Sequence, residues 1–217
     1  MLDQSKLNLS VIFCDEVGRG PLAGPVVACA VHFIVTQNLL KEFKKLNIRD
    51  SKKTTQKERA FILKSLGMGW ENEDIHKSDF LARALHHPIT YSIVQIDNHL
   101  IDEINILSAS LLAMKKAVIH CLNENTSELV LVDGNQPLRD FTLSQESVVK
   151  GDSKYYGIAL ASILAKSFRD EIMDYWDALY PHFQFKKNKG YPTAFHRQQI
   201  NLFGITPIHR KSFRGVQ

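Results

Sequence analysis

Two apolar segments joined by a turn rich in glycine and proline constrain the fold of this chain more than any other feature. Residues 7–14 and 26–35 are rich in valine and isoleucine, which favours buried β-strands over helices. Together they predict a hairpin with an unusually elaborate connection. The residues that shape this connection are Gly18, Gly20, Pro21, Gly24 and Pro25.

The rest of the chain alternates between strand and helix patterns. Further strands are predicted at residues 89–96, 129–132 and 142–149, and helices at 55–66, 104–122, 156–179 and 194–203, with a loop at 184–190. Leu107, Leu111, Met114 and Val118 recur at three- and four-residue steps, which gives the helix at 104–122 one apolar face. The pattern predicts a mixed α/β layer fold.

Length and composition narrow the class of protein. A chain of 217 residues that is 44% hydrophobic suits one well-packed domain. Cys14, Cys29 and Cys121 lie far apart, which favours reduced thiols and a cytoplasmic location over a zinc site or disulfides. The longest apolar stretch, residues 25–31, is far shorter than the ~20 residues that span a bilayer, so we expect no membrane partner.

Acidic residues stand at the ends of two predicted strands. Asp15 and Glu16 follow one apolar run and Asp133 follows another, which is where α/β sheets place their sites. Asp133 before Gly134 is, by itself, also a common turn former. Carboxylates that converge repel one another unless a cation lies between them, and oxygen ligands without nearby Cys or His suit Mg²⁺ or Mn²⁺. The pattern indicates a metal site that acts on phosphodiesters.

The C-terminal part of the chain is basic. No Asp or Glu follows Asp177, and aromatic residues at 183, 185, 191 and 195 alternate with the cations. A solvated surface and a nucleic-acid-binding surface both fit a basic tail, and the aromatic residues favour the second because they could face sugars or bases. The cations are Lys186, Lys187, Lys189, Arg197, Arg210, Lys211 and Arg214.

Several segments closely match a known family. DEVGRGPLAGPVVACAV at residues 15–31 and KGDSKYYGIALASILAKSFRD at 150–170 are the most specific, and DSKK, VDG, NKGYPTAFH and HRKSF add to them. Over nearly its whole length the chain resembles bacterial ribonuclease HII. The resemblance implies a ribonuclease H-like α/β fold with a central mixed five-stranded sheet flanked by helices. Residues 1–180 would form the catalytic domain, and residues 181–217 a short, basic helical extension packed on it.

The resemblance also implies the catalytic residues. Its four acidic positions fall on Asp15, Glu16, Asp133 and Asp170, of which the first three would bind Mn²⁺ or Mg²⁺. One ion is expected without substrate and a second with it. Asp170 rests on the resemblance alone, because Lys166 and Asp170, four residues apart on a helix, are by default an ordinary surface pair.

The substrate-binding residues follow in the same way. The resemblance assigns the backbone of Gly18, Arg19 and Gly20 to the ribose 2′-hydroxyl, and Tyr191 to the deoxyribose after the cleavage point. Glycines suit that task because they let main-chain groups approach a sugar closely. Motifs near the phosphate path supply Lys52, Ser153 and Lys154.

The implied activity is that of an endoribonuclease. It would hydrolyse the RNA strand of RNA/DNA hybrids and incise on the 5′ side of ribonucleotides embedded in duplex DNA, leaving 3′-hydroxyl and 5′-phosphate ends. Nucleic acid is the expected partner, and we expect a monomer without an obligate protein partner.

Three alternatives are distinguishable from the sequence. Ribonuclease HIII carries an additional N-terminal domain and a lysine in the turn, whereas this chain has Arg19 and only fourteen residues before Asp15. A proofreading-type exonuclease spaces its first acids as D-x-E, and here they are adjacent. A non-catalytic nucleic-acid-binding module would explain the basic tail, but not the acidic residues.

Overall fold

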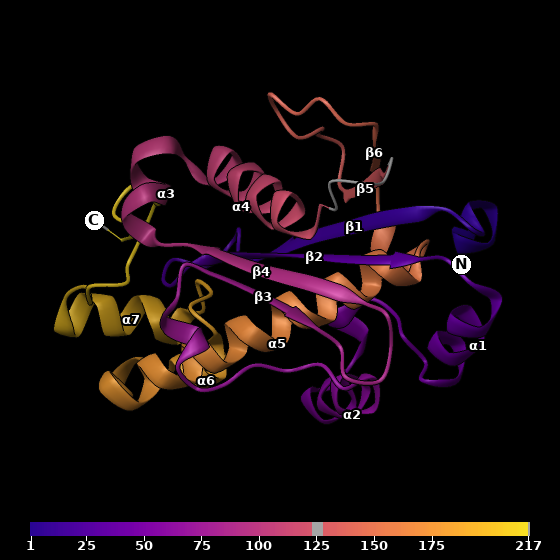
Figure 1. Ribbon diagram of the computed structural model, residues 1–217. Coiled ribbons are helices and arrows are strands. Elements are labelled where there is room, and N and C mark those ends of the chain that lie inside the picture. Colours follow the sequence, from indigo (N-terminus) through magenta and orange to yellow (C-terminus); the bar gives the residue numbers. More distant parts are fainter. Residues whose placement is uncertain (123–127, 217) are drawn as a thin grey trace.

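A six-stranded sheet organises the computed structural model, which describes residues 1–122 and 128–216 (Figure 1). The strand order is β3-β4-β2-β1-β5-β6; β3, β4, β2 and β1 pair antiparallel, while β5 pairs parallel with β1 and β6. The strands are β1 (Ser10–Val17), β2 (Val26–Ile34), β3 (Asp79–Arg83), β4 (Thr90–Ile96), β5 (Leu129–Asp133) and β6 (Gln145–Val148).

The expected mixed α/β sheet is confirmed, but the number of strands is wrong by one. The strand missing from the prediction is β3, which lies at the edge of the sheet and pairs only with β4 among the described strands. Its side chains alternate between exposed and half-buried positions, and none is fully buried. A short edge strand without a buried face carries little apolar periodicity for sequence analysis to detect.

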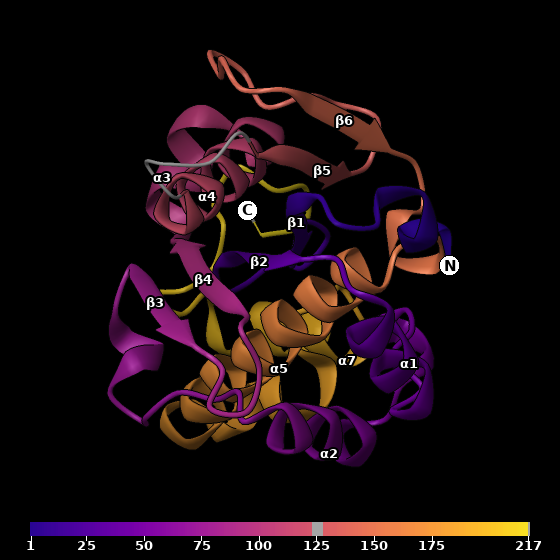
Figure 2. The ribbon, with the colours of Figure 1, turned by 45° about the vertical axis from the view of Figure 1, so that its right-hand side comes forward.

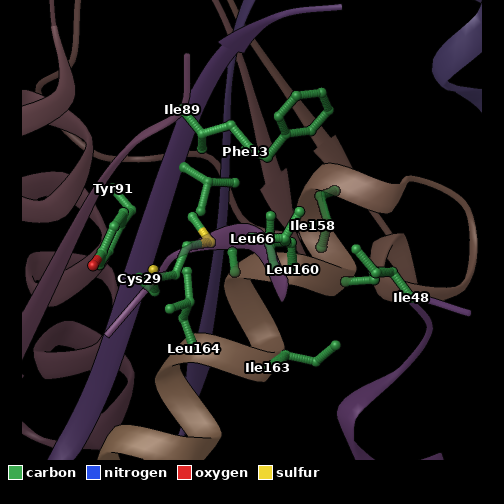
Figure 3. Close-up of a cluster of buried hydrophobic side chains, with 14 of the residues drawn as sticks. Phe13, Cys29, Ile48, Leu66, Ile89, Tyr91, Ile158, Leu160, Ile163 and Leu164 are labelled. Atoms are coloured by element: carbon green, nitrogen blue, oxygen red, sulfur yellow. The ribbon is translucent and has the colours of Figure 1, made fainter. Parts of the chain in front are cut away.

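Helices cover both faces of the sheet, and the alternation along β1 divides the core between them. Figure 1 shows α4 (Ile106–Cys121) on one side and α5 (Tyr156–Leu179) on the other. In Figure 2, α1 (Gln37–Lys45) and α2 (Gln56–Leu66) lie on the α5 side. Phe13 packs with Cys29 and Leu160 on the α5 side (Figure 3), whereas Ile12 and Cys14 pack toward α4.

The four predicted helices are confirmed, with α2 at the range expected as 55–66, but shorter helices between them were not predicted. The helix expected at residues 104–122 is α4, which begins at Ile106; a separate helix, α3 (Asn98–Ile104), precedes it, was not predicted, and is bent by 118° from α4 at the break. Asn105 has a φ of 66° and its side chain caps α4 by accepting from Ser108 N at 3.0 Å. The loop expected at 184–190 contains the short helix α6 (Phe185–Asn188). Both α5 and α7 (Ala194–Phe203) match their predicted ranges.

A membrane-spanning helix is not evident in the described residues. None of their helices is by itself long and apolar enough to cross a bilayer, and only the sharply bent α3–α4 pair passes by length and composition together.

The C-terminal segment packs on the body through a third apolar cluster. Phe183 and Phe185 lie inside it, stacked on each other with ring centroids 5.3 Å apart. The expectation that these two rings face sugars or bases is therefore wrong, because they are buried. The cluster comprises Leu22, Ala23, Met173, Phe183, Phe185, Ile200, Ile208 and Val216.

A distant carboxylate caps the N-terminus of α5. Both side-chain oxygens of Asp3, which is fully buried, accept from the backbone N–H of Tyr156, at 3.0 and 2.9 Å. The N-cap residue Tyr155 supplies no side-chain cap of its own. Asp3 therefore satisfies a helix end that its local sequence leaves open.

Removing this cap is expected to destabilise the protein. Asp3→Ala should lower the free energy of unfolding by about 1 to 2 kcal/mol, because a buried N–H loses its acceptor. Asp3→Asn keeps an acceptor and should recover most of the loss. Urea unfolding followed by circular dichroism measures both; equal midpoints for wild type and Asp3→Ala would show that the cap contributes nothing.

Candidate active site

Strand register brings the predicted acids of β1 and β5 to one place. Cys14 pairs with Val132 in the parallel ladder, so Asp15 and Asp133 follow on the next row and share the face toward α5. Asp15 is only 5% exposed, and its carboxylate accepts a hydrogen bond from the Ser162 side chain on α5. Glu16 is the next residue of the strand, and Asp15, Glu16 and Asp133 interact electrostatically with one another.

Burial raises the pKa of all three carboxyls, and the charges of neighbouring acids raise those of Asp15 and Glu16 further. Burial is the largest cause for Asp15, whose pKa lies well above its ordinary value, and the charges of Glu16 and Asp133 add to it. Burial also raises the pKa of Glu16, against the opposing charge of Arg19. The pKa of Asp133 is raised by burial too, while the N–H of Gly151 (2.6 Å) and the charge of Lys52 oppose the rise. Three crowded carboxylates with high pKa values fit a site for a hard cation.

The side chains are not yet arranged around an ion. Among residues 1–122 and 128–216, no three His, Cys, Asp or Glu side chains converge closely enough to hold one. Glu16 lies 3.5 Å from the guanidinium of Arg19, and one oxygen of Asp133 is engaged by Gly151. To hold a shared ion, the two side chains would have to turn toward each other, or bind the ion through the oxygens that these partners do not engage.

Asp170 lies apart from these three acids. It is 4% exposed and pairs with Arg59 at 2.7 Å and with Lys166 at 2.5 Å. Asp170 follows Ser162, the residue that contacts Asp15, by eight positions, which is ~12 Å along a helix. The interpretation of Lys166 and Asp170 as an ordinary surface pair is wrong, since Asp170 is buried between two cations.

Asp152, which the sequence analysis passed over, lies with the acids instead. It belongs to the 3-10 helix η4 (Gly151–Ser153), and its pKa is raised by burial first and then by the charges of Asp50 and Asp133. The signal was present in the GDSK segment, from which only Ser153 and Lys154 were selected. Both of those residues are exposed.

The DSKK segment also reaches the acids. Lys52 lies in the 3-10 helix η2 (Ser51–Lys53), and its charge acts on both Asp133 and Asp152. Ser51 is buried with its Oγ 2.9 Å from the Oγ of Ser162, so a chain of hydroxyls connects this segment to Asp15. The structure thus places the charge of Lys52 beside Asp133 and Asp152.

Two buried arginines shape the turn between β1 and β2. Arg210 donates to the carbonyls of Gly18 (2.6 Å), Arg19 (3.1 Å), Pro21 (2.8 Å) and Gly24 (2.9 and 2.8 Å). Arg169 donates to the carbonyls of Ala23, Pro25 and Lys189. Burial lowers the pKa of Arg210 to about 9 and of Arg169 to about 10, so both remain charged at neutral pH. Neither arginine was singled out for this role from the sequence, although both lie in recognised motifs.

The arginines turn the carbonyls of the turn inward. Gly18 has a φ of 95°, and a Cβ there would collide with Nε of Arg169, so the position requires glycine. Within the described part of the chain, the backbone N–H groups of Arg19 and Gly20 donate to no protein acceptor. These groups are therefore free to bind a ligand.

Tyr191 lies against the same turn. A Cβ on Gly20 would be 3.5 Å from the Tyr191 ring, which is 42% exposed. The N–H of Leu22 also donates to the carbonyl of Gly190 at 2.7 Å, which joins the two segments directly. The structure thus brings Tyr191 to the turn that carries Gly18, Arg19 and Gly20.

Only part of the basic tail is available to a ligand. Arg210 is buried, and Lys189 forms an ion pair with Asp174 and donates to the carbonyl of Asp170. The remaining cations are exposed: Lys186, Lys187, Arg197, Lys211 and Arg214.

Comparison with known proteins decides the family. The family model described as ribonuclease HII matches residues 12–216. The chain belongs to the ribonuclease HII family. It is 45% identical to the ribonuclease HII of Caldicellulosiruptor saccharolyticus over 92% of this chain and 84% of that one, and 42% identical to that of Christiangramia forsetii over 99% and 95%.

Solved structures support the ribonuclease H-like fold of this chain. The ribonuclease H2 of Pyrococcus horikoshii superposes with a TM-score of 0.66 at 22% identity, covering 96% of this chain and 95% of that one. A Bst-RNase HIII in complex with Mn²⁺ gives a TM-score of 0.69 at 15% identity, covering 100% and 70%.

Membership of this family establishes the reaction class. The protein is a hydrolase, an endonuclease that cleaves RNA in RNA/DNA hybrids, and catalysis in the family depends on metal ions. The earlier alternatives of a proofreading exonuclease and a non-catalytic binding module are thereby excluded.

Proposed function

We propose that Asp15, Glu16 and Asp133 bind Mg²⁺ or Mn²⁺, one ion without substrate and a second with it. What supports this is the donor set: three carboxylates, one buried and two half-buried, whose pKa values are all raised by burial, with no nitrogen or sulfur ligand among them. When bound, divalent ions supply charge stabilisation at the scissile phosphate and lower the pKa of attacking water. The Mn²⁺ complex of the structurally similar Bst-RNase HIII is consistent with this choice of ions.

Asp152 is a better candidate than Asp170 for the fourth acid. It approaches Asp133 and Asp50 closely enough for their charges to raise its pKa, whereas Asp170 is neutralised by Arg59 and Lys166. In this proposal Lys52 stays beside the acids and contacts the phosphate backbone, as Ser153 and Lys154 do from the exposed end of η4.

The specific substrate proposed is duplex DNA that contains a single ribonucleotide. The enzyme would incise on its 5′ side and leave 3′-hydroxyl and 5′-phosphate ends. The observation that carries this proposal is the position of the Tyr191 ring, 3.5 Å from where a Cβ on Gly20 would lie. The group that packs on a sugar is therefore beside the N–H groups that can meet a 2′-hydroxyl. One chain supplies all of these groups, so a monomer is sufficient.

Such a site needs only one ribose. Because the Gly18 and Arg19 carbonyls point inward to Arg210, the N–H groups of Arg19 and Gly20 point outward. These N–H groups can donate to the oxygen of one 2′-hydroxyl. The next sugar then meets the face of Tyr191. A deoxyribose at that position allows closer packing on the ring than a ribose, because it lacks the additional hydroxyl. We therefore expect a preference for the ribonucleotide that precedes DNA.

Tyr191 variants test this preference. Tyr191→Ala should slow incision of a duplex with one central ribonucleotide by about tenfold, since stacking on an aromatic ring contributes ~1 to 3 kcal/mol. Tyr191→Phe keeps the ring and should be mild. Single-turnover cleavage of an end-labelled duplex, beside a continuous RNA/DNA hybrid, gives both rates and the position of the cut. If wild type cuts only the continuous hybrid, the proposed substrate is wrong.

A further inference from the structure

A buried pair of histidines supports the backbone at Tyr191. His196, on α7, and His209 are both 0% exposed, and their Nε2 atoms are 3.0 Å apart. Nδ1 of His196 lies 2.9 Å from the Tyr191 carbonyl oxygen, and Nδ1 of His209 lies 2.9 Å from the backbone nitrogen of Thr206. The four residues form one chain of hydrogen bonds that ends at Tyr191.

The two ends of this chain fix its protons. The Thr206 N–H can only donate, so Nδ1 of His209 accepts, and the Tyr191 carbonyl can only accept, so Nδ1 of His196 carries a hydrogen. In neutral rings, Nε2 of His209 must then donate to Nε2 of His196. Burial lowers the pKa of both rings, that of His209 to about 4, which keeps them neutral. The hydrogen bonds therefore all run in one direction, with each donor on the Thr206 side and each acceptor on the Tyr191 side.

Arg210, the residue after His209, holds the Gly18–Gly20 turn, which is the other half of the proposed substrate-binding surface. Arg210 donates to the carbonyls of Gly18 and Arg19, and the backbone of the same segment bonds to the turn, as in Gly24 N to Ile208 O at 2.9 Å. Ala23 and His209 also form a β-bridge. Two consecutive residues thus connect to both parts of the proposed substrate site: His209 to Tyr191, through His196, and Arg210 to the Gly18–Gly20 turn.

We propose that His209 and Arg210, with His196 as the intermediate, are positioning residues that fix Tyr191 relative to the Gly18–Gly20 turn. They thereby set the preference for a ribose followed by a deoxyribose. This inference rests on the proposed function of Tyr191 and the turn. None of the three side chains touches the substrate in this proposal. His196 and Arg210 act through the backbone of Tyr191 and of the turn, and His209 acts through His196.

A double-mutant cycle tests whether His196 acts through Tyr191. His196→Leu removes the donor to the Tyr191 carbonyl and should slow incision at a single ribonucleotide by about fivefold, the effect of one net hydrogen bond. In a Tyr191→Ala background the same change should have no further effect. His196→Asn places a donor near the former Nδ1 and should restore most of the rate. Cleavage of a continuous RNA/DNA hybrid should change less in every variant.

Two results would overturn the inference. If His196→Leu lowers the incision rate equally in both backgrounds, it causes general structural damage. If it does not lower the rate at all, the hydrogen bonds between Thr206 and Tyr191 do not affect the site. If His196→Leu does not fold, His209→Asn replaces it: this variant keeps an acceptor for Thr206, loses the donor to His196, and should show the same dependence on Tyr191. Wild-type rates for Tyr191→Ala would reject the proposed function itself, whereas a slow Tyr191→Ala with an additive His196→Leu would reject only the positioning role.

Discussion

Asp133→Asn is expected to lower turnover on an RNA/DNA hybrid by about a thousandfold or more, because metal ions contribute several kcal/mol to the stabilisation of such a transition state. The amide keeps the size of the side chain and can still accept from Gly151. Steady-state cleavage with saturating Mn²⁺ measures the effect. Near wild-type turnover would show that Asp133 is only a turn former.

Stability provides the control for this variant. Because burial raises the pKa of Asp133 above its value of 3.8 in an unfolded chain, its carboxyl favours folding only while protonated and disfavours it as the pH rises through the folded pKa. In EDTA at pH 7, Asp133→Asn should therefore melt at or above the temperature of wild type, and the difference should vanish toward pH 4. Mn²⁺ should raise the melting temperature of wild type more than that of the variant. A variant that melts far below wild type would point to lost packing instead.

The second large effect separates Asp152 from Asp170. Asp152→Asn should lower turnover by up to about a hundredfold with little change in stability, as expected when a group at a metal site is lost. Asp170→Asn removes the charge that compensates Arg59 and Lys166, and should cost about 3 kcal/mol of stability, since the buried cations lose their partner. Turnover per folded molecule should change little in that variant.

Paired measurements of turnover and chemical denaturation on the two variants decide between the acids. Glu171→Gln is a matched control, because Glu171 is also an acid of α5 but accepts a hydrogen bond from Trp70 and not from the residues around Asp15 and Asp133. Loss of turnover in Asp170→Asn at unchanged stability, with a normal Asp152→Asn, would restore Asp170 as the fourth acid.

The parts of this site that the sequence predicted depend on short segments. Apolar runs followed by acids predicted Asp15, Glu16 and Asp133 near strand ends, and they lie within the last three residues of β1 and at the last residue of β5; glycines mark the turn after β1. Pairing of β1 with β5 then brings the acids together, because parallel neighbours keep equivalent residues on one face.

The parts that the sequence did not predict depend on contacts between distant segments. The partner of Asp170 is Arg59, 111 residues away, and nothing in either local pattern indicates this contact. The partners of Arg169 are backbone carbonyls, which any sequence provides, so residue identity at the partner positions carries no signal. The helix α3, which precedes Asn105, has only seven residues, too few for an apolar period to indicate it.

The inner face of the turn has a consequence for the order in which the enzyme forms. Arg210 bonds to the carbonyl of Gly18 across 192 positions of the chain. Ribosomes synthesise the N-terminus first, and closing so large a loop is among the slow steps of folding. The sheet and its acids can therefore assemble while the turn still lacks its inner hydrogen-bond donors. A nascent chain acquires its means of recognising a ribose only after almost all of its residues have left the ribosome.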